Sequence, residues 1–250
     1  MMSGHSKWSQ IKHQKAGNDA RRGQLFTKLA RELTIAAREG GSDPDANVRL
    51  RLAIQHAKDA NLPSENVERA IKRGTGQSDG AALEEAVYEG YGPGGAAVLV
   101  EVATDNRNRA AADVRSAFSR GGGNLGEAGC VGWLFEPRGV VEVKVDGHDP
   151  DDIALHAIDA GAEDVKAEGD TMEIYTTPTS LDRVRRAMEE LHLSVTNAES
   201  TVIPKTTLAT DDETVLRVLR LVDRLEELDD VQKVYTNVEI PDSVIEQYSR

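Results

Sequence analysis

The chain has 250 residues, of which 30 are Lys or Arg and 43 are Asp or Glu, so its formal net charge is −13. At this length two or three small domains are expected rather than one core. The sequence has no apolar run long enough for a transmembrane helix and no apolar segment behind its basic start that would make a secretory signal. Its single cysteine, Cys130, cannot form an internal disulfide. We therefore expect a soluble cytoplasmic protein.

Charge is distributed unevenly along the chain. Residues 1–80 hold 14 basic and 9 acidic residues, a net charge of +5, whereas the remaining 170 residues hold 16 basic and 34 acidic residues, a net charge of −18. Residues 4–31 alone carry seven Lys or Arg against one acid, Asp19. A dense basic segment on a strongly acidic protein indicates binding to a polyanion. The alternative interpretation is a solvated, disordered basic tail without a partner.

The basic segment consists of an arm and a helix. Residues 1–16 show neither a helical nor a strand period, and we interpret them as an extended arm. A helix is predicted over residues 18–39, because apolar side chains recur there at helical spacing, and two glycines end it. The face opposite the apolar stripe is basic, with Arg21, Lys28, Arg31 and Arg38.

Two further helices complete an N-terminal domain. Asp43 before a proline is typical of a helix start and predicts a helix over residues 45–60. A shorter helix is predicted over residues 64–73, and the glycine-rich stretch 74–80 then marks a boundary. The first predicted domain is therefore residues 1–80, a basic arm plus a three-helix domain.

The rest of the chain alternates strands and helices, so the predicted fold class is α+β. Between residues 140 and 203 the predicted order is β-α-β-β-α-β, which is the order of a ferredoxin-like domain. Further strands are predicted at 132–135 and at 231–240, the latter after a helix over 211–228.

Neither flanking segment completes a sheet by itself, so we predict that they share one. The expected organisation is two α/β-sandwich domains, the second inserted into the first. The discontinuous α+β domain comprises residues 82–137 and 206–240, and the inserted ferredoxin-like α+β domain comprises residues 138–205.

No catalytic constellation is evident. The glycine-rich turn 90–95 lacks the spacing of a nucleotide-binding loop and is interpreted as a hairpin turn. The six histidines lack the spacing of metal ligands, and Cys130 is interpreted as a buried structural thiol. The acidic pairs 151–152, 211–212 and 229–230 are assigned to helix caps and solvated loops. We predict no enzyme activity, no cofactor and no metal site.

Candidate nucleic-acid contacts lie in the basic segment and in residues 104–109, at a strand-to-helix junction. Arg107 and Arg109 occupy the first turn of the predicted helix, where basic residues oppose the helix dipole. They either face phosphate at the helix N-terminus or bridge to the acidic body, and both alternatives stay open. The candidate residues are His5, Lys7, Trp8, Lys12, His13, Lys15, Arg21, Arg22, Lys28, Arg31, Arg107 and Arg109.

Nine blocks of the sequence resemble the YebC/PmpR family. They are GHSKW at 4–8, IKHQK at 11–15, ARRGQLFTKLARELTIAAREGG at 20–41, DPDAN at 43–47, NLPSENVERAIKRGTG at 61–76, YEGYGPGG at 88–95, TDNRNR at 104–109, DAGAEDV at 159–165 and DDVQKVYTN at 229–237. The blocks span nearly the whole chain in order. The resemblance implies three domains, the last inserted into the second, and a cytoplasmic, non-enzymatic role.

Two functions follow from the resemblance. Family members are described as probable transcriptional regulators that bind DNA, and others as translation factors that contact the ribosome and relieve stalling at proline-rich sequences. The expected partner is accordingly nucleic acid, either DNA or ribosomal RNA and tRNA on the ribosome, with no membrane partner and a monomeric state. Against DNA, the sequence shows no helix-turn-helix of standard spacing and no zinc finger. In favour of RNA, a basic arm with an aromatic residue suits irregular or single-stranded RNA.

Overall fold

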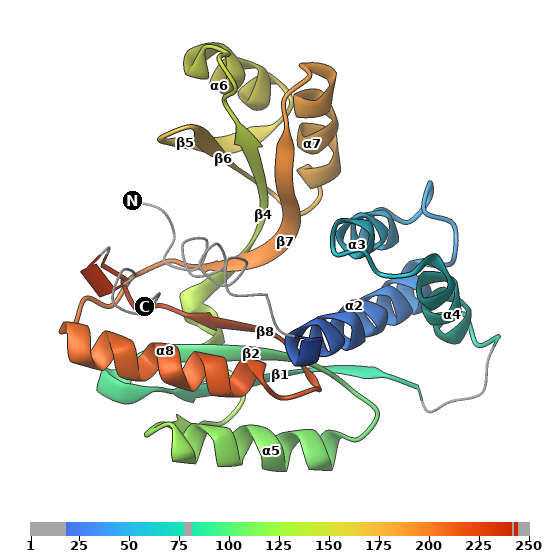
Figure 1. Cartoon of the computed structure of the whole chain (residues 1–250). Helices are drawn as coiled ribbons and strands as arrows, with labels where there is room; N and C mark the ends of the chain where they lie inside the picture. The colour runs from blue at the N-terminus through green and yellow to red at the C-terminus, as the bar shows by residue number, and fades with distance from the viewer. Residues whose placement is uncertain (1–18, 78–81, 242, 245–250) are drawn as a thin grey trace. The chain divides into compact units, whose positions relative to one another are not determined.

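The computed structural model describes residues 19–77, 82–241 and 243–244 (Figure 1). The predicted arm, residues 1–16, lies outside them. The described part is mixed α+β, with an N-terminal helical region followed by two sheet-containing regions, which confirms the predicted fold class. The described residues divide into two compact units, one of residues 135–205 and one of the described residues in 19–134 and 206–244. No described helix is both long enough and apolar enough to cross a bilayer.

The N-terminal helical region contains three helices around one small core. They are α2 (Asp19–Gly40), α3 (Val48–Asp59) and α4 (Ser64–Gly74). Leu33, Leu50 and Ala53 are fully buried between them, because the apolar residues of each helix recur on one face.

The second of these helices begins three residues later than predicted, at Val48 instead of residue 45. Asn47 is the N-cap, since its side chain accepts a hydrogen bond from the Leu50 amide at 3.0 Å. Its amide nitrogen also donates to the Ala36 carbonyl at 2.8 Å. Asp43 instead accepts from the Asp45 amide and stabilises a turn before the helix. Asn47 therefore defines the start of α3, because its side chain binds both the first turn of α3 and the end of α2.

The larger unit contains an antiparallel sheet built from both of its chain segments. Strands β1 (Glu84–Tyr91), β2 (Ala97–Thr104), β3 (Asn124–Leu125) and β8 (Val231–Thr236) form the order β3-β1-β2-β8. Helices α5 (Arg107–Arg120) and α8 (Asp212–Glu226) pack on one face. Alternate residues of β2, among them Val98 and Val100, are fully buried against Phe118 and Leu219 of these helices. The turn between β1 and β2 closes a hairpin, as predicted.

The helical region contacts this sheet through a separate apolar cluster. Ile35 of α2 packs with Leu83 and Ala103, and all three side chains are buried. Helix α2 therefore has two packing faces, one toward α3 and α4 and one toward the sheet. The apolar stripe in the sequence predicts only the face toward α3 and α4.

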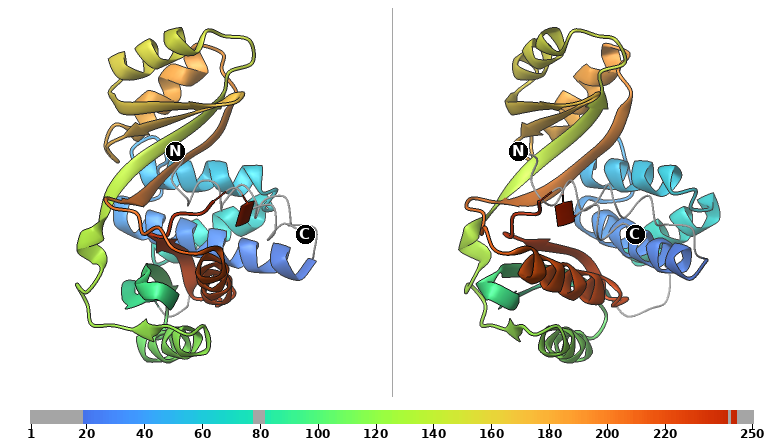
Figure 2. Two further views of the ribbon diagram at one scale, coloured as in Figure 1. Left: turned by 90° about the vertical axis from the view of Figure 1, so that its left-hand side faces the viewer. Right: turned by 60° about the vertical axis from the view of Figure 1, so that its left-hand side comes forward.

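Residues 135–205 form the predicted ferredoxin-like arrangement (Figure 2). The elements in chain order are β4 (Phe135–Lys144), α6 (Pro150–Asp159), β5 (Ala162–Glu168), β6 (Thr171–Thr176), α7 (Leu181–Glu190) and β7 (Val195–Pro204). The antiparallel order is β5-β6-β4-β7, and Phe135 pairs with Pro204, so the first and last residues of the unit's sheet are neighbours. Both helices lie on one face of the sheet.

Two strand predictions were wrong in their bounds. Residues 132–134 form a short 3₁₀ helix instead of a strand. The Glu89 carboxylate accepts the amide N–H groups of Gly129, Val131 and Gly132, so these groups cannot pair with a neighbouring strand. The last strand, β8, ends at Thr236, and Val238 forms only an isolated bridge with Leu208.

Two helical glycines give a matched test of the packing between α2 and α4. A Cβ at Gly74 would lie 2.2 Å from the Thr34 carbonyl oxygen, whereas a Cβ at Gly23 would meet nothing within 4 Å. We expect Gly74→Ala to destabilise the protein by about 1–3 kcal/mol. Gly23→Ala should instead stabilise it by about 0.5–1 kcal/mol, because alanine is the better helix former. Denaturant unfolding measures both, and equal effects would contradict this packing.

Candidate functional site

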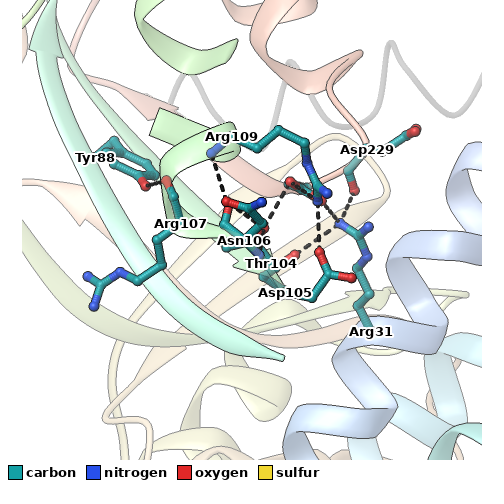
Figure 3. Close-up of polar contacts among 10 residues, drawn as sticks. Arg31, Tyr88, Thr104, Asp105, Asn106, Arg107, Arg109 and Asp229 are labelled. Carbon is teal, nitrogen blue, oxygen red and sulfur yellow. Dashed lines mark hydrogen bonds and ion pairs between the residues drawn. The ribbon is translucent and has the colours of Figure 1, made fainter. Parts of the chain in front are cut away.

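Three elements of the larger unit converge on one carboxylate, Asp230, immediately before β8 (Figure 3). Arg31 of α2 reaches it with Nη1 at 2.6 Å, and Arg109 of α5 reaches it with Nη2 at 2.8 Å. The Thr104 hydroxyl, at the end of β2, donates to the same carboxylate at 2.9 Å. The side chain of Asp230 is only 10% exposed. We call these four residues the Asp230 junction.

Hydrogen bonds to nearby loops and a helix cap position the two arginines. Asn106 caps α5 by accepting a hydrogen bond from the Arg109 amide at 3.0 Å, and Asp105 binds the Arg109 guanidinium at 2.9 Å. Arg31 also donates to the carbonyls of Ala103 and Asp229, at 2.9 and 2.6 Å. The guanidinium of Arg31 is therefore bound on several sides.

The junction holds Asp230 in its charged form. Burial opposes ionisation, but hydrogen bonds from Arg109, Thr104 and Arg31 outweigh it and lower the pKa of Asp230 below its usual value. Removing one partner of such a pair leaves an uncompensated charge, which costs several kcal/mol in buried cases. The junction is thus an intramolecular lock between α2, α5 and β8.

Among the other described candidate residues, some are bound within the protein and some are exposed to a ligand. Lys28 donates to the Glu226 carbonyl at 2.7 Å, so like Arg31 it is engaged by the end of α8. Arg22 is exposed, with its guanidinium 5.3 Å from the centre of the Phe26 ring. Arg107 projects away from the junction and is 64% exposed, 3.9 Å from Glu84. For Arg109 the structure matches the bridging alternative.

The remaining candidates lie elsewhere in the chain. Arg21 belongs to α2, but its side chain is not among those that the structure describes. The six arm residues lie outside the described part, namely His5, Lys7, Trp8, Lys12, His13 and Lys15.

Sequence reasoning missed the role of Asp230, which had been assigned to a solvated loop with Asp229. Asp229 is exposed, as expected, but Asp230 is buried. One signal was available: two arginines in the first turn of α5 oppose the helix dipole and require a compensating carboxylate. Because the chain has 43 Asp or Glu residues, its sequence does not indicate which carboxylate binds these arginines.

Cys130 also departs from its prediction, because it is half-buried instead of fully buried. Its loop is fixed by Glu89, whose three backbone hydrogen bonds overcome the effect of burial and lower the pKa of that carboxyl. Burial first, and then the neighbouring Glu89, raise the pKa of the Cys130 thiol. A thiol with a raised pKa is a poor nucleophile near neutral pH.

The described residues include no group of three or more His, Cys, Asp or Glu arranged to hold a metal ion.

In residues 135–205, Glu142 of β4 lies opposite Glu173 of β6 across the sheet. Burial, and then the charges of Glu173 and Glu199, raise the pKa of Glu142 to about 7.

Comparisons with known proteins agree with this architecture. The model of the TACO1/YebC protein N-terminal domain matches residues 6–77, and that of the TACO1/YebC second and third domain matches residues 83–238. A mixed α+β protein with a helical N-terminal region and two antiparallel sheets is thus the class defined by the fold. The chain belongs to the TACO1/YebC family.

Individual relatives match along nearly their whole length. A "Probable transcriptional regulatory protein" of Moorella thermoacetica is 56% identical over 249 residues, which cover 98% of this chain and 99% of that protein. One of the same description from Dehalococcoides mccartyi is 55% identical over 247 residues, covering 99% and 98%. The crystal structure of a conserved hypothetical protein from Aquifex aeolicus has a TM-score of 0.81 and 48% identity, covering 90% of this chain and 93% of that one.

The Asp230 junction predicts a stability loss on Asp230→Asn. We expect about 2–4 kcal/mol at pH 7, because Arg31 loses its partner in a largely buried position. Since the folded-state pKa of Asp230 is lowered, its contribution is present above the unfolded pKa and disappears as pH falls through the folded pKa. Urea unfolding from pH 7 down to pH 3 should therefore show the gap closing. Asp229→Asn, one residue away and exposed, should change stability by less than about 0.5 kcal/mol. A similar loss for both variants would contradict the junction.

The raised pKa of Glu142 predicts the opposite dependence of stability on pH. Because its folded-state pKa is raised to about 7, the folded protein holds the proton more tightly than the unfolded chain, and stability falls as pH rises from about 4.5 to 7. Glu142→Gln mimics the neutral acid, so its advantage over the natural chain should grow by about 1–2 kcal/mol between pH 5 and pH 8, allowing for solvent screening. Glu190→Gln on α7 is an exposed control. A constant difference for Glu142→Gln across this range would refute the raised pKa.

Proposed function

We propose that this chain is a non-enzymatic, cytoplasmic, nucleic-acid-binding regulator of gene expression. The observation that carries the proposal is charge segregation: the first 80 residues have a net charge of +5 and the rest −18. A polyanion attracts the first part and repels the second, so the charge distribution favours one orientation of the protein on nucleic acid. The relatives described as probable transcriptional regulatory proteins support the regulatory role.

Some of the candidate basic residues are already bound within the protein, so fewer of them are available to bind phosphate. Lys28 binds the end of α8, and Arg31 and Arg109 bind Asp230, so a phosphate contact at any of the three would have to replace an internal one. We therefore assign phosphate and base contacts to the residues before and at the start of α2. They are His5, Lys7, Trp8, Lys12, His13, Lys15, Arg21 and Arg22, with exposed Arg107 as a further phosphate contact.

The names of the relatives favour control of transcription as the role, and DNA is the ligand that this role would require. One observation favours a second candidate, an RNA-contacting translation factor on the ribosome. Trp8 lies among Lys7, Lys12 and two histidines, and an aromatic side chain in a basic segment suits stacking on an unpaired base.

The binding proposal predicts a salt dependence. If about five basic side chains of residues 4–31 touch phosphate, the slope of log K against log salt should be roughly −3.5 to −4.5. Combined Lys7→Ala, Lys12→Ala and Lys15→Ala should reduce the slope by about 2–3 and weaken binding to all sequences alike. Lys144→Ala, in the acidic unit, is the matched control and should change neither quantity. Unaltered affinity after the triple substitution would overturn the proposal.

A separate experiment distinguishes the two candidate ligands. Co-sedimentation of the full chain with ribosomes, abolished by RNase, would support the translation role and contradict the transcriptional one. Recovery with particular promoter fragments, and not with ribosomes, would support the transcriptional role.

A further inference from the structure

Helix α6 of residues 135–205 exposes two large aliphatic side chains. Leu155 is 65% exposed and Ile158 is 58% exposed, whereas Ile153 and Ala157 of the same helix are buried against the unit's own sheet. Leu155 and Ile158 are three residues apart, so they lie on the same side of the helix. Burying such side chains in an interface is favourable, since each removes a large apolar area from water.

Three aspartates border this aliphatic pair. At 100° per residue, Asp151, Asp152 and Asp159 all fall within about 60° of Leu155, on the face away from the sheet. All three are exposed, and helix α6 contains no Lys or Arg. We call Leu155, Ile158 and these three aspartates the α6 face.

The aspartates of the α6 face form no ion pair with any basic residue that the structure describes. Arg183 of α7 lies against Gly161, just beyond the helix, but makes no such pair with them. Asp149, the N-cap, is occupied with the Asp151 amide. Negative charge on the α6 face is thus uncompensated within the unit's described part.

The charge of the whole unit limits which partner can cover this face. Residues 135–205 contain 16 Asp or Glu and seven Lys or Arg, a net charge of −9. Nucleic acid and anionic lipid are repelled by it. A second copy of the chain docking through the same α6 face would place three aspartates against three aspartates across a symmetric contact. A cationic partner with apolar side chains fits both features of the face.

Partner attachment by strand addition is disfavoured at β5, the edge strand next to α6. The edge strand β5, which follows α6, carries Glu163, Asp164 and Lys166 and has a register irregularity between Ala162 and Asp164. Charged side chains and bulges on an edge strand block pairing with another strand. The helix face is therefore a more suitable docking surface than the neighbouring β5 edge.

We propose that the α6 face docks a lysine- and arginine-rich protein segment that inserts aliphatic or aromatic side chains against Leu155 and Ile158. This interaction is independent of the nucleic-acid contacts proposed above. The apolar pair supplies affinity, and the surrounding aspartates select a cationic partner and accelerate association.

The first test uses a fluorescent amphipathic helical peptide of lysine and leucine, about 14 residues long, titrated with the full chain and followed by anisotropy. Leu155→Ser combined with Ile158→Ser should raise Kd at least about tenfold. Val48→Ser combined with Val87→Ser, at exposed apolar positions outside this unit, is the matched control and should change Kd by less than about twofold. Equal affinity of the Leu155/Ile158 variant and the natural chain would overturn the proposal.

A second set of measurements tests the charge selection. Asp151→Asn, Asp152→Asn and Asp159→Asn together should weaken peptide binding and flatten its salt dependence, and a peptide with glutamine in place of lysine should bind much more weakly. Hydrogen exchange should show peptide-induced protection in residues 150–160, and protection confined to other segments would refute the site. If the Leu155/Ile158 variant instead abolished self-association or DNA binding, the occupant would be a second copy or nucleic acid and the proposal would fail.

Discussion

The larger unit depends on the ionised carboxylate of Asp230. It joins Arg31 of the N-terminal helix to Arg109 of α5 and to the end of β2, and none of these partners is close to it in sequence. Because the carboxylate is largely buried, each arginine must stay in place for the other contacts to be stable. The same contact orients α2, from which the basic N-terminal segment extends. The Asp230 junction therefore fixes the position of α2, at whose start the proposed nucleic-acid contacts lie.

Much of the fold could be predicted from periodicity and turn residues. The ferredoxin-like order predicted for residues 138–205 followed from alternating apolar patterns, although its first strand begins earlier, at Phe135. The helices followed from apolar spacing with glycine or proline at their ends. Failures occurred where side chains bind backbone. Asn47 delays the start of α3, and the Glu89 carboxylate binds the amides of Gly129, Val131 and Gly132, which are then not available to a strand. Such long-range contacts leave no local pattern in the sequence.

The candidate site was less predictable than the fold, for an electrostatic reason. Local composition identified the basic segment, but it could not separate basic residues that face solvent from those that bind within the protein. Lys28 and Arg31 lie on the same helix as Arg22. Only the tertiary structure shows that Lys28 is bound by the last residue of α8 and Arg31 by the turn that follows it. Charge counting thus overestimates the number of side chains available to a polyanion.

The pairing of Phe135 with Pro204 has a consequence for how the chain is organised. Chain entry into the ferredoxin-like unit and exit from it are adjacent, so a short bridge could replace the whole unit without disturbing the strands of the host sheet. The unit is therefore a separable insertion, and substitutions on α6 leave the strand pairing of the host sheet unchanged.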